Sequence, residues 1–362
     1  LEGLGLTINQ VYLMHIDNTY IYQGGDYNLE ELFSLEDVTE KSRDFALAII
    51  PEKLDEMWQI LDQDFPPSIE IGSHCTSPYK CPFYGHCHQD LPDHPIRELP
   101  RSSKKLRDNL KDSGIEDIRE IPEDYPGLND LQKRVISCVG TDTLYISPEA
   151  PEIIAGILYP LSFIDFETFN PALPIYHLTR PFQPIPFQWS LHIQYLSGQL
   201  EHQDFLYENA EDPRLGFVES LLDAIPDVGT IIAYSGYEES TIKQLATVFP
   251  KFENELLALC DRIFDLLKLI RDHYYHPEFH GSFSIKSVLP AIIPNMGYGD
   301  LAIQHGLIAA IDFGKLISPA TPDTIKDKTK QALLEYCQRD TEAMVRIFEN
   351  LAFNSLPKII RT

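Results

Sequence analysis

The sequence lacks any run of 18 apolar residues, so we do not expect a membrane-spanning helix. Its first residues, Leu1–Leu6, also lack the basic and apolar regions of a signal peptide, which favours a cytoplasmic location. The chain does not begin with Met, and we expect it to be part of a longer protein. Its length of 362 residues and apolar content of 43% are typical of a folded chain with two or three domains.

Basic residues are scarce in this sequence. The chain has 29 Lys and Arg against 55 Asp and Glu, and its formal net charge is −26. A nucleic-acid-binding protein usually carries a basic surface. The excess of acidic residues argues against a broad basic surface of this kind. The one basic segment is residues 96–111, with a net charge of +4. A solvated linker is the more ordinary interpretation of that segment.

Cysteine is scarce, with six in the chain, but three of the six are clustered. They follow the spacing Cys75-x5-Cys81-x5-Cys87. In a cytosolic protein such a cluster indicates zinc or an iron–sulfur cluster, for which four ligands are usual. Histidines that could replace the missing fourth cysteine are His74, His86 and His88. Three unligated thiols in a loop remain the alternative.

Hydrophobic periodicity and turn residues predict the order of secondary structure. In the first part of the chain we expect two strands in residues 7–23, with a turn at Asp17–Asn18, then helix over residues 29–61 and short helices over 102–134. The second part begins near Ile153 with a strand meander. Helices are then expected at residues 215–224, from Glu239, at 252–273 and at 326–351, with a strand at 229–234. This order favours a ribonuclease-H-like α/β fold.

Two acidic residues lie at the end of an apolar strand. The run Leu161–Thr168 reads Leu-Ser-Phe-Ile-Asp-Phe-Glu-Thr, and side chains two apart on a strand share a face. Asp165 and Glu167 therefore point the same way. Two carboxylates on a buried face are costly unless a positive charge lies between them. A divalent metal ion is the simplest candidate.

A third acidic residue interrupts the apolar stripe of the last predicted helix. The stripe consists of Leu333, Cys337, Met344, Ile347 and Leu351, at helical spacing. Asp340 lies within it, and Tyr336 lies one turn before Asp340 on the same side. If Asp340 is considered alone, a salt bridge or a position at the edge of the stripe would explain its presence there.

The segment Ile231–Ser240 contains two further acids. A strand is expected to end near Tyr234, so Glu238 and Glu239 begin the following helix. The helix dipole alone favours acids there, so this signal is weak in isolation.

The order of these three features resembles the DEDD exonuclease superfamily, in its tyrosine-containing branch. Asp165 and Glu167 match the first motif, Glu238 the second, and Tyr336 with Asp340 the third. The sequence departs from the pattern at the second motif, which usually carries aspartate where Glu238 stands. An asparagine expected just upstream is also replaced, since Tyr234 and Ser235 occupy that region.

Four segments resemble the DUF2779 family more closely, over about residues 150–350. These segments are Phe163–Thr168, Arg180–Gln188, Gly281–Pro290 and Tyr336–Met344. The resemblance implies an exonuclease-like domain fused behind a RecB/Cas4-like nuclease with an iron–sulfur cluster. Residues 1–90 look like the end of that nuclease.

The expected nuclease remnant lacks its catalytic pair. A RecB-type nuclease needs an acid-x-Lys pair, and no Asp-x-Lys or Glu-x-Lys occurs in the 362 residues. We therefore expect the N-terminal nuclease to be inactive here, with its catalytic half outside this sequence. The resemblance implies a 4Fe–4S cluster in the full-length protein, and in this chain the cysteines would hold an incomplete cluster or zinc.

The resemblance also implies a mechanism. Asp165, Glu167, Glu238 and Asp340 would hold two Mg²⁺ or Mn²⁺ ions about 3.5–4 Å apart for phosphodiester hydrolysis. Tyr336 would orient the attacking water. Arg180 and Lys286 are candidates for contact with phosphate, although a purely structural role is as common for such residues.

The sequence thus predicts three regions: a nuclease remnant over residues 1–95, a helical and hairpin-like linker over 96–150, and a DEDD-type exonuclease-like domain over 151–362. The expected activity is metal-dependent 3′–5′ cleavage of DNA or RNA, acting on single-stranded 3′ ends. The alternative is a non-catalytic nucleic-acid-binding or scaffold protein that keeps the fold with a degenerate metal site. The replacement at Glu238 and the acidic composition favour this alternative, whereas Asp340 within its apolar stripe opposes it.

Overall fold

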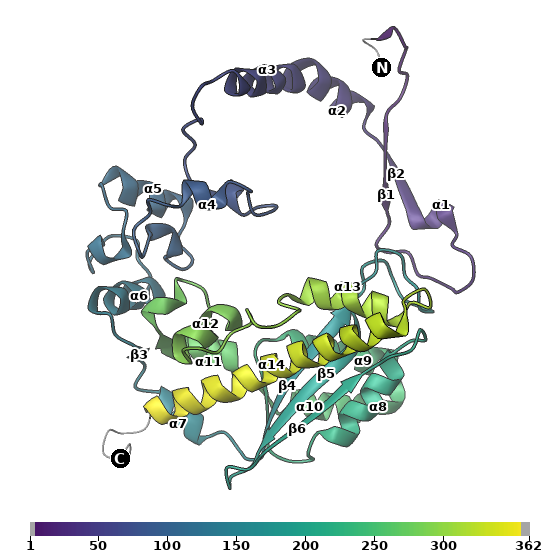
Figure 1. The fold of residues 1–362 in the computed structure, drawn as a ribbon, viewed down its shortest axis with the longest axis vertical. Helices are drawn as coiled ribbons and strands as arrows, with labels where there is room; N and C mark the ends of the chain where they lie inside the picture. The colour runs from purple at the N-terminus through teal and green to yellow at the C-terminus, as the bar shows by residue number, and fades with distance from the viewer. Residues whose placement is uncertain (1–3, 356–362) are drawn as a thin grey trace. The chain divides into compact units, whose positions relative to one another are not determined.

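The computed structural model describes residues 4–355 (Figure 1). Residues 1–3 of the segment Leu1–Leu6 lie outside the described residues. So do residues 356–362 of the expected exonuclease-like domain. The chain divides into two compact units. The first combines Leu1–Leu91 with Pro171–Gln183, and the second combines Pro92–Asn170 with Pro184–Thr362. Residues 96–150, expected as a linker, thus pack in the same unit as most of the residues that follow them.

The first unit contains one antiparallel strand pair and several helices. Strand β1 (Tyr12–Ile16) pairs with β2 (Phe33–Asp37). Of the two strands predicted in residues 7–23, only the first forms, and its partner β2 comes from the segment that was expected to be helical. In the second, Tyr22 instead donates its backbone N–H to Thr179 O at 3.0 Å. Its helices are α1 (Leu29–Leu32), α2 (Thr39–Asp44), a π-helical turn at Phe45–Ile49, α3 (Ile50–Leu61) and α4 (Tyr84–Cys87).

A five-stranded mixed sheet forms the centre of the second unit. Its order is β6-β5-β4-β7-β8, where β5 runs antiparallel to its neighbours and β4, β7 and β8 are parallel. The strands are β4 (Leu161–Phe169), β5 (Ile185–Gln194), β6 (Leu200–Leu206), β7 (Thr230–Ala233) and β8 (Ile263–Asp265). The chain is thus a mixed α/β protein, as the sequence predicted at this coarser level.

Helices cover both faces of this sheet. One face packs on α8 (Arg214–Ala224), α9 (Tyr237–Val248) and α10 (Glu253–Cys260) through a core that includes Ile164 and Phe166 of β4. The other face packs on α12 (Ile285–Ile292), α13 (Gly306–Ile317) and the long α14 (Asp323–Ser355), with Leu161 and Phe163 in that core. Figure 1 shows α14 running along β4 and β5. Alternate residues of β4 therefore face different cores, as its two-residue period requires.

The long helix expected over residues 252–273 is instead two helices separated by a strand. Helix α10 ends at Cys260, β8 adds to the sheet beside β7, and α11 (Leu266–His273) follows. Asp265 ends β8 and caps α11, because its side chain accepts a hydrogen bond from Lys268 N at 2.8 Å. A three-residue strand is too short to disturb a helical pattern in the sequence, which explains the error.

The region before the sheet contributes to the same core. It contains α5 (Lys104–Asp112), α6 (Asp130–Thr141), β3 (Tyr145–Ile146), which pairs with β9 (Tyr274–Tyr275), and α7 (Ala150–Ala155). Asn129 and Gln132 form a capping box at the start of α6. The buried Gln132 amide also donates to Pro100 O at 3.0 Å, which joins α6 to the segment before α5.

Candidate active site

Strand β4 brings two carboxylates to the face of the sheet that α14 covers. Asp165 and Glu167 follow Leu161 and Phe163 at two-residue spacing, so all four side chains share this face. Glu167 is buried, and Asp165 is half-buried. Strand β4 pairs with β7 over Leu161–Phe163, and its pairing with β5 continues through both acids. A register shift between Glu167 and Thr168 interrupts the pairing with β5 just after the second acid.

Helix α14 places Asp340 against these two acids. Carboxylate oxygens of Asp165, Glu167 and Asp340 all lie within 4.8 Å of one another, an arrangement that could hold a metal ion. Asp340 is 7% exposed, as expected for a residue in the apolar stripe of the helix. Its Oδ1 accepts a hydrogen bond from the Tyr298 hydroxyl. Residues far apart in the sequence therefore meet at one buried point.

Glu238 lies in the first turn of α9 and is buried. It is outside the group of three, but its charge helps to raise the pKa of both Asp165 and Glu167. Its Oε2 is buried and has no hydrogen-bond partner among the described residues. An unpaired buried carboxylate oxygen is costly, and this oxygen is a potential ligand atom near the site.

Burial is the main cause of raised pKa values in all four acids. It raises the pKa of Glu167 to about 8, with a further contribution from Asp340, and that of Asp340 to about 6. Burial and the charges of Asp265 and Asp340 raise the pKa of Glu238 to about 7. The pKa of Asp165 lies well above its ordinary value, because burial acts together with the three neighbouring acids. The site thus concentrates negative charge, which a bound cation would neutralise.

Lys286 supplies a positive charge beside this group. Its Nζ donates to the Tyr336 hydroxyl at 3.2 Å and to the Gln304 backbone carbonyl. The ammonium counteracts part of the rise in the pKa of Glu167 and Asp340. Lys286, predicted as a phosphate contact, therefore lies at the site. Arg180 belongs to the first unit, where its N–H donates to Gln183 Oε1 at 3.0 Å, and its contact with phosphate stays a prediction.

Tyr336 lies one turn before Asp340 on α14 and is 4% exposed. Burial and the charge of Asp340 raise its pKa, so the hydroxyl keeps its proton at neutral pH. A protonated hydroxyl that accepts from Lys286 can direct its own O–H toward a water or an oxygen of a ligand. This arrangement suits positioning of a water and does not suit a general base.

A cavity of about 340 Å³ opens beside Glu167. Its lining includes Thr168 and Tyr237, whose hydroxyls are 2.6 Å apart, and the start of α13 at Gly306. A side chain at Gly306 would extend toward Glu167, since an added Cβ would lie 3.6 Å from Glu167 Oε2. The volume falls within the range of about 300–1,000 Å³ that is usual for small-ligand clefts.

The cysteine loop lies in the first unit. Cys75 is buried, Cys81 is half-buried, Cys87 is exposed, and all are free thiols. The Cys81 N–H donates to Cys75 O at 2.9 Å, which closes part of the loop. Within residues 4–355, however, the three sulfurs do not form a group with all ligand atoms inside 4.8 Å of one another. The zinc or iron–sulfur interpretation of these cysteines stays a prediction.

Two residues of the site were missed from the sequence. Tyr298 lies in a loop between α12 and α13 and reaches Asp340 only through the fold. Cys337 was assigned to the core, but its Sγ lies 3.5 Å from Asp165 Oδ2 and donates to it. The position of Cys337 in the same stripe as Asp340 was a usable signal for this contact. No local pattern marks Tyr298.

The chemistry of the donor set fits a divalent metal. Carboxylate oxygens are the ligands that Mg²⁺ and Mn²⁺ prefer. Three of them meet within 4.8 Å, and the unpartnered Oε2 of Glu238 lies in the same electrostatic cluster. Lys286 offsets part of the charge of Glu167 and Asp340, and Arg339 offsets part of that of Asp340, but the pKa values of all four acids stay raised. A bound cation would therefore balance the site better than the protein does alone.

Residues 162–284 match the family model described as "Domain of unknown function (DUF2779)". The resemblance predicted from the sequence is confirmed over this segment, which contains Asp165, Glu167 and Glu238. Tyr336 and Asp340 lie beyond it. Comparisons with curated proteins and with solved structures found no match. None of the helices within residues 4–355 is long and apolar enough to cross a membrane.

Proposed function

We propose that the second unit is a metal-dependent 3′–5′ exonuclease that hydrolyses phosphodiester bonds of DNA or RNA. The observation that carries this proposal is the convergence of Asp165, Glu167 and Asp340 within 4.8 Å on a buried face. A structural role alone would not explain it, because two buried acids and one half-buried acid, only partly offset by Lys286, destabilise a fold. Functional sites are where such a cost is commonly retained.

The sheet supports a ribonuclease-H-like assignment. Numbered from β4, its strands lie in the order 3-2-1-4-5, with only the second antiparallel to the others. The first strand is central and carries Asp165 and Glu167, while the last helix carries Asp340. The elements that carry these residues support the DEDD resemblance, because Asp165 and Glu167 lie on a strand, Glu238 begins a helix and Asp340 lies on the last helix.

Asp165, Glu167, Asp340 and Glu238 would hold the Mg²⁺ or Mn²⁺ ions. When bound, such ions supply a nucleophilic water at neutral pH and stabilise charge on the leaving oxygen. The chain itself positions the reactants. Tyr336 would orient the attacking water with its O–H, while its oxygen accepts a hydrogen bond from Lys286.

The test is digestion of single-stranded DNA and RNA, labelled at either the 5′ or the 3′ end, with Mn²⁺. The full chain is compared with Asp165→Asn, which keeps the side-chain shape, and with Asp261→Asn, which removes an exposed acid on the same unit. We expect release of nucleotides from 3′ ends by the native chain and by Asp261→Asn. Asp165→Asn should lose at least about 10²-fold in rate, because it removes a metal ligand.

Two outcomes would contradict the proposal. Equal release by the native chain and Asp165→Asn would indicate a contaminating nuclease. Binding of the labelled strands without release from any of them would favour the non-catalytic nucleic-acid-binding alternative. The replacement of aspartate by Glu238 is the specific feature that makes this second outcome worth measuring.

A further inference from the structure

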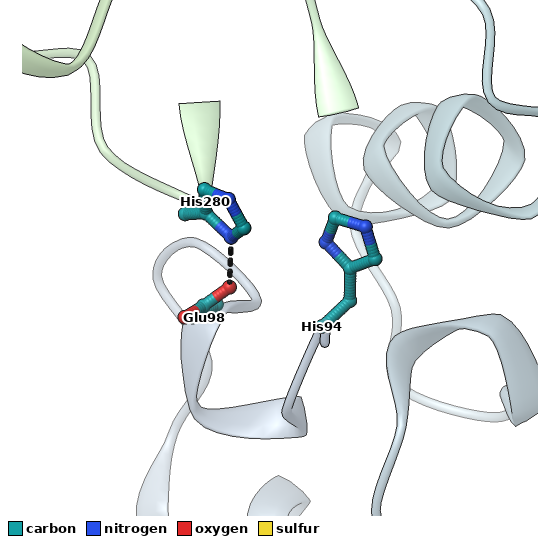
Figure 2. Close-up of side chains that lie close together, drawn as sticks. All are labelled: His94, Glu98 and His280. Carbon is teal, nitrogen blue, oxygen red and sulfur yellow. Dashed lines mark hydrogen bonds and ion pairs between the residues drawn. The ribbon is translucent and has the colours of Figure 1, made fainter. Parts of the chain in front are cut away.

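A second cluster of potential metal ligands lies within the second unit. It consists of His94, Glu98 and His280, whose ligand atoms all lie within 4.8 Å of one another. Figure 2 shows Glu98 beside the His280 ring, with the His94 ring next to them. His280 Nδ1 lies 3.0 Å from Glu98 Oε2, and the two imidazole rings are 5.2 Å apart between centroids. This set of donors is chemically unlike the all-carboxylate site on β4.

The backbone around this cluster is closely packed. Glu98 ends a short 3₁₀ helix (Ile96–Glu98), and His280 follows another (Pro277–Phe279). The two segments touch at Gly281, where an added Cβ would lie only 1.8 Å from Glu98 O. Ile96 and Phe279 are both buried in the core. The three ligands thus project from backbone that is held in place without any ion.

His94 has a ring nitrogen with no partner. Its Nδ1 is buried and makes no hydrogen bond among the described residues. An imidazole nitrogen withdrawn from water normally finds a donor or an acceptor. The His94 carbonyl is engaged, since Ile118 N donates to it at 2.7 Å, so the main chain at this position is fixed. A ligand bound beside the ring would satisfy the free nitrogen.

We propose that His94, Glu98 and His280 bind a transition-metal ion of the Zn²⁺ class. Two imidazoles and one carboxylate are a donor set suited to such ions and unsuited to Mg²⁺. Tetrahedral bonds of about 2.0–2.1 Å place neighbouring ligand atoms about 3.3 Å apart. The separation of 3.0 Å between His280 Nδ1 and Glu98 Oε2 is close to this value. Binding of an ion would replace the hydrogen bond between His280 and Glu98 and would require the rings to turn. The His280 side chain is 44% exposed, but its Nε2 also lies 3.6 Å from Glu278 Oε2, so this contact would change as well.

The bound ion would join two segments that are distant in the sequence. One is the stretch before α5, and the other is the turn that leads into α12, where Lys286 reaches the carboxylate site. The ion would therefore act as a structural clip at the start of α12. Three protein ligands leave a fourth coordination position for water.

The experiment titrates the full chain with Co²⁺, a spectroscopic substitute for Zn²⁺. Cys75, Cys81 and Cys87 are replaced by Ser and Asp165 by Asn, so that the other candidate sites are weakened. We expect one equivalent of Co²⁺ with the strong visible absorption of a four-coordinate ion, displaced by Zn²⁺. In this background, His280→Asn and Glu98→Gln should each weaken binding at least about 10-fold.

His280→Asn is well suited to the backbone, because His280 has a φ of +46° and asparagine tolerates this region. His15→Asn, at an exposed histidine of the first unit, is the matched control and should bind as the background does. Unchanged circular dichroism of each variant without metal verifies the fold. Absence of the four-coordinate spectrum in the background chain, or its persistence in both His280→Asn and Glu98→Gln, would overturn the proposal.

Discussion

At the scale of single residues, the candidate active site is a balance between buried acids and a few neutralising contacts. The Tyr298 hydroxyl donates to Asp340, Cys337 donates to Asp165, and the Lys286 ammonium lies beside Glu167 and Asp340. These contacts hold the carboxylates in place without removing their excess charge. The two tyrosines at the site have different partners, and this difference separates their expected roles.

We expect Tyr298→Phe and Tyr336→Phe to affect different quantities. Tyr298→Phe removes the hydroxyl that orients Asp340, so it should weaken Mn²⁺ binding roughly 10–100-fold. Tyr336→Phe leaves that contact intact and should lower the rate at saturating Mn²⁺ by about 10²-fold, because the water loses its orienting group. Mn²⁺ binding followed by electron paramagnetic resonance and the rate of nucleotide release measure the two effects.

Tyr274→Phe is the control for these two variants, because its hydroxyl is also buried but contacts Ser355. Neither metal affinity nor rate should change in that variant beyond the effect of altered stability. If Tyr336→Phe weakened Mn²⁺ binding as much as Tyr298→Phe, the assignment of separate roles would be wrong.

At the scale of elements, the site depends on how β4 is held between its neighbours. Strand β7 begins beside the start of β4, where Thr230 N donates to Leu158 O at 2.8 Å. Gly229 precedes this contact with a φ of +93°, and an added Cβ would lie 2.1 Å from Pro160 O. Only glycine permits such an approach, so the register that positions β4 depends on this residue.

Gly229→Ala should therefore destabilise the protein by about 3 kcal/mol or more, because both the backbone conformation and the contact with Pro160 become unfavourable. Gly198→Ala is the matched control. Gly198 has a similar φ of +86° but no atom within 4 Å of an added Cβ, so it should cost only about 1–2 kcal/mol. Urea unfolding of both variants measures the difference. Equal losses would show that the contact with Pro160 contributes nothing.

At the scale of the whole molecule, buried titratable groups make stability depend on pH in two opposite ways. Glu167, Glu238 and Asp340 have pKa values of about 8, 7 and 6 in the folded chain, all above their ordinary values. Between these values and about pH 4, the folded state binds more protons than the unfolded state, so stability rises as pH falls. His192 acts in the other direction, because burial lowers its pKa to about 4. Below about pH 6.5, the His192 side chain takes up a proton in the unfolded state but not in the folded state. Its contribution therefore lowers stability as the pH is lowered.

We expect the metal-free chain to be more stable at pH 6 than at pH 8, because the acids are increasingly protonated over this interval. Mn²⁺ should stabilise the chain more at pH 8 than at pH 6, since it competes with protons for the same oxygens. Urea midpoints across this range, with and without Mn²⁺, measure both effects. His192→Asn should remove the destabilising contribution of this histidine below about pH 6.5 and have little effect at pH 8. Greater stability at pH 8 than at pH 6 without metal would contradict the expectation.

Several features of this protein follow from local sequence alone. The shared face of Asp165 and Glu167 follows from the two-residue period of a strand, and the inward position of Asp340 follows from helical spacing. The helices at Arg214–Ala224 and Asp323–Ser355 have strong periodic patterns and were predicted with small errors at their ends. The DUF2779 resemblance was also visible in short motifs.

Only the tertiary structure decided which of these residues meet. The approach of Asp340 to β4, the contact from Tyr298 and the grouping of His94 with His280 depend on packing between segments that are distant in the chain. Strand β8 was likewise not predictable from local sequence, because three residues carry too little periodicity to oppose a helical pattern. Pairing with β7 stabilises this strand in the fold. Local propensity acts over a few residues, but the free energy that brings distant side chains together comes from burial of the shared core.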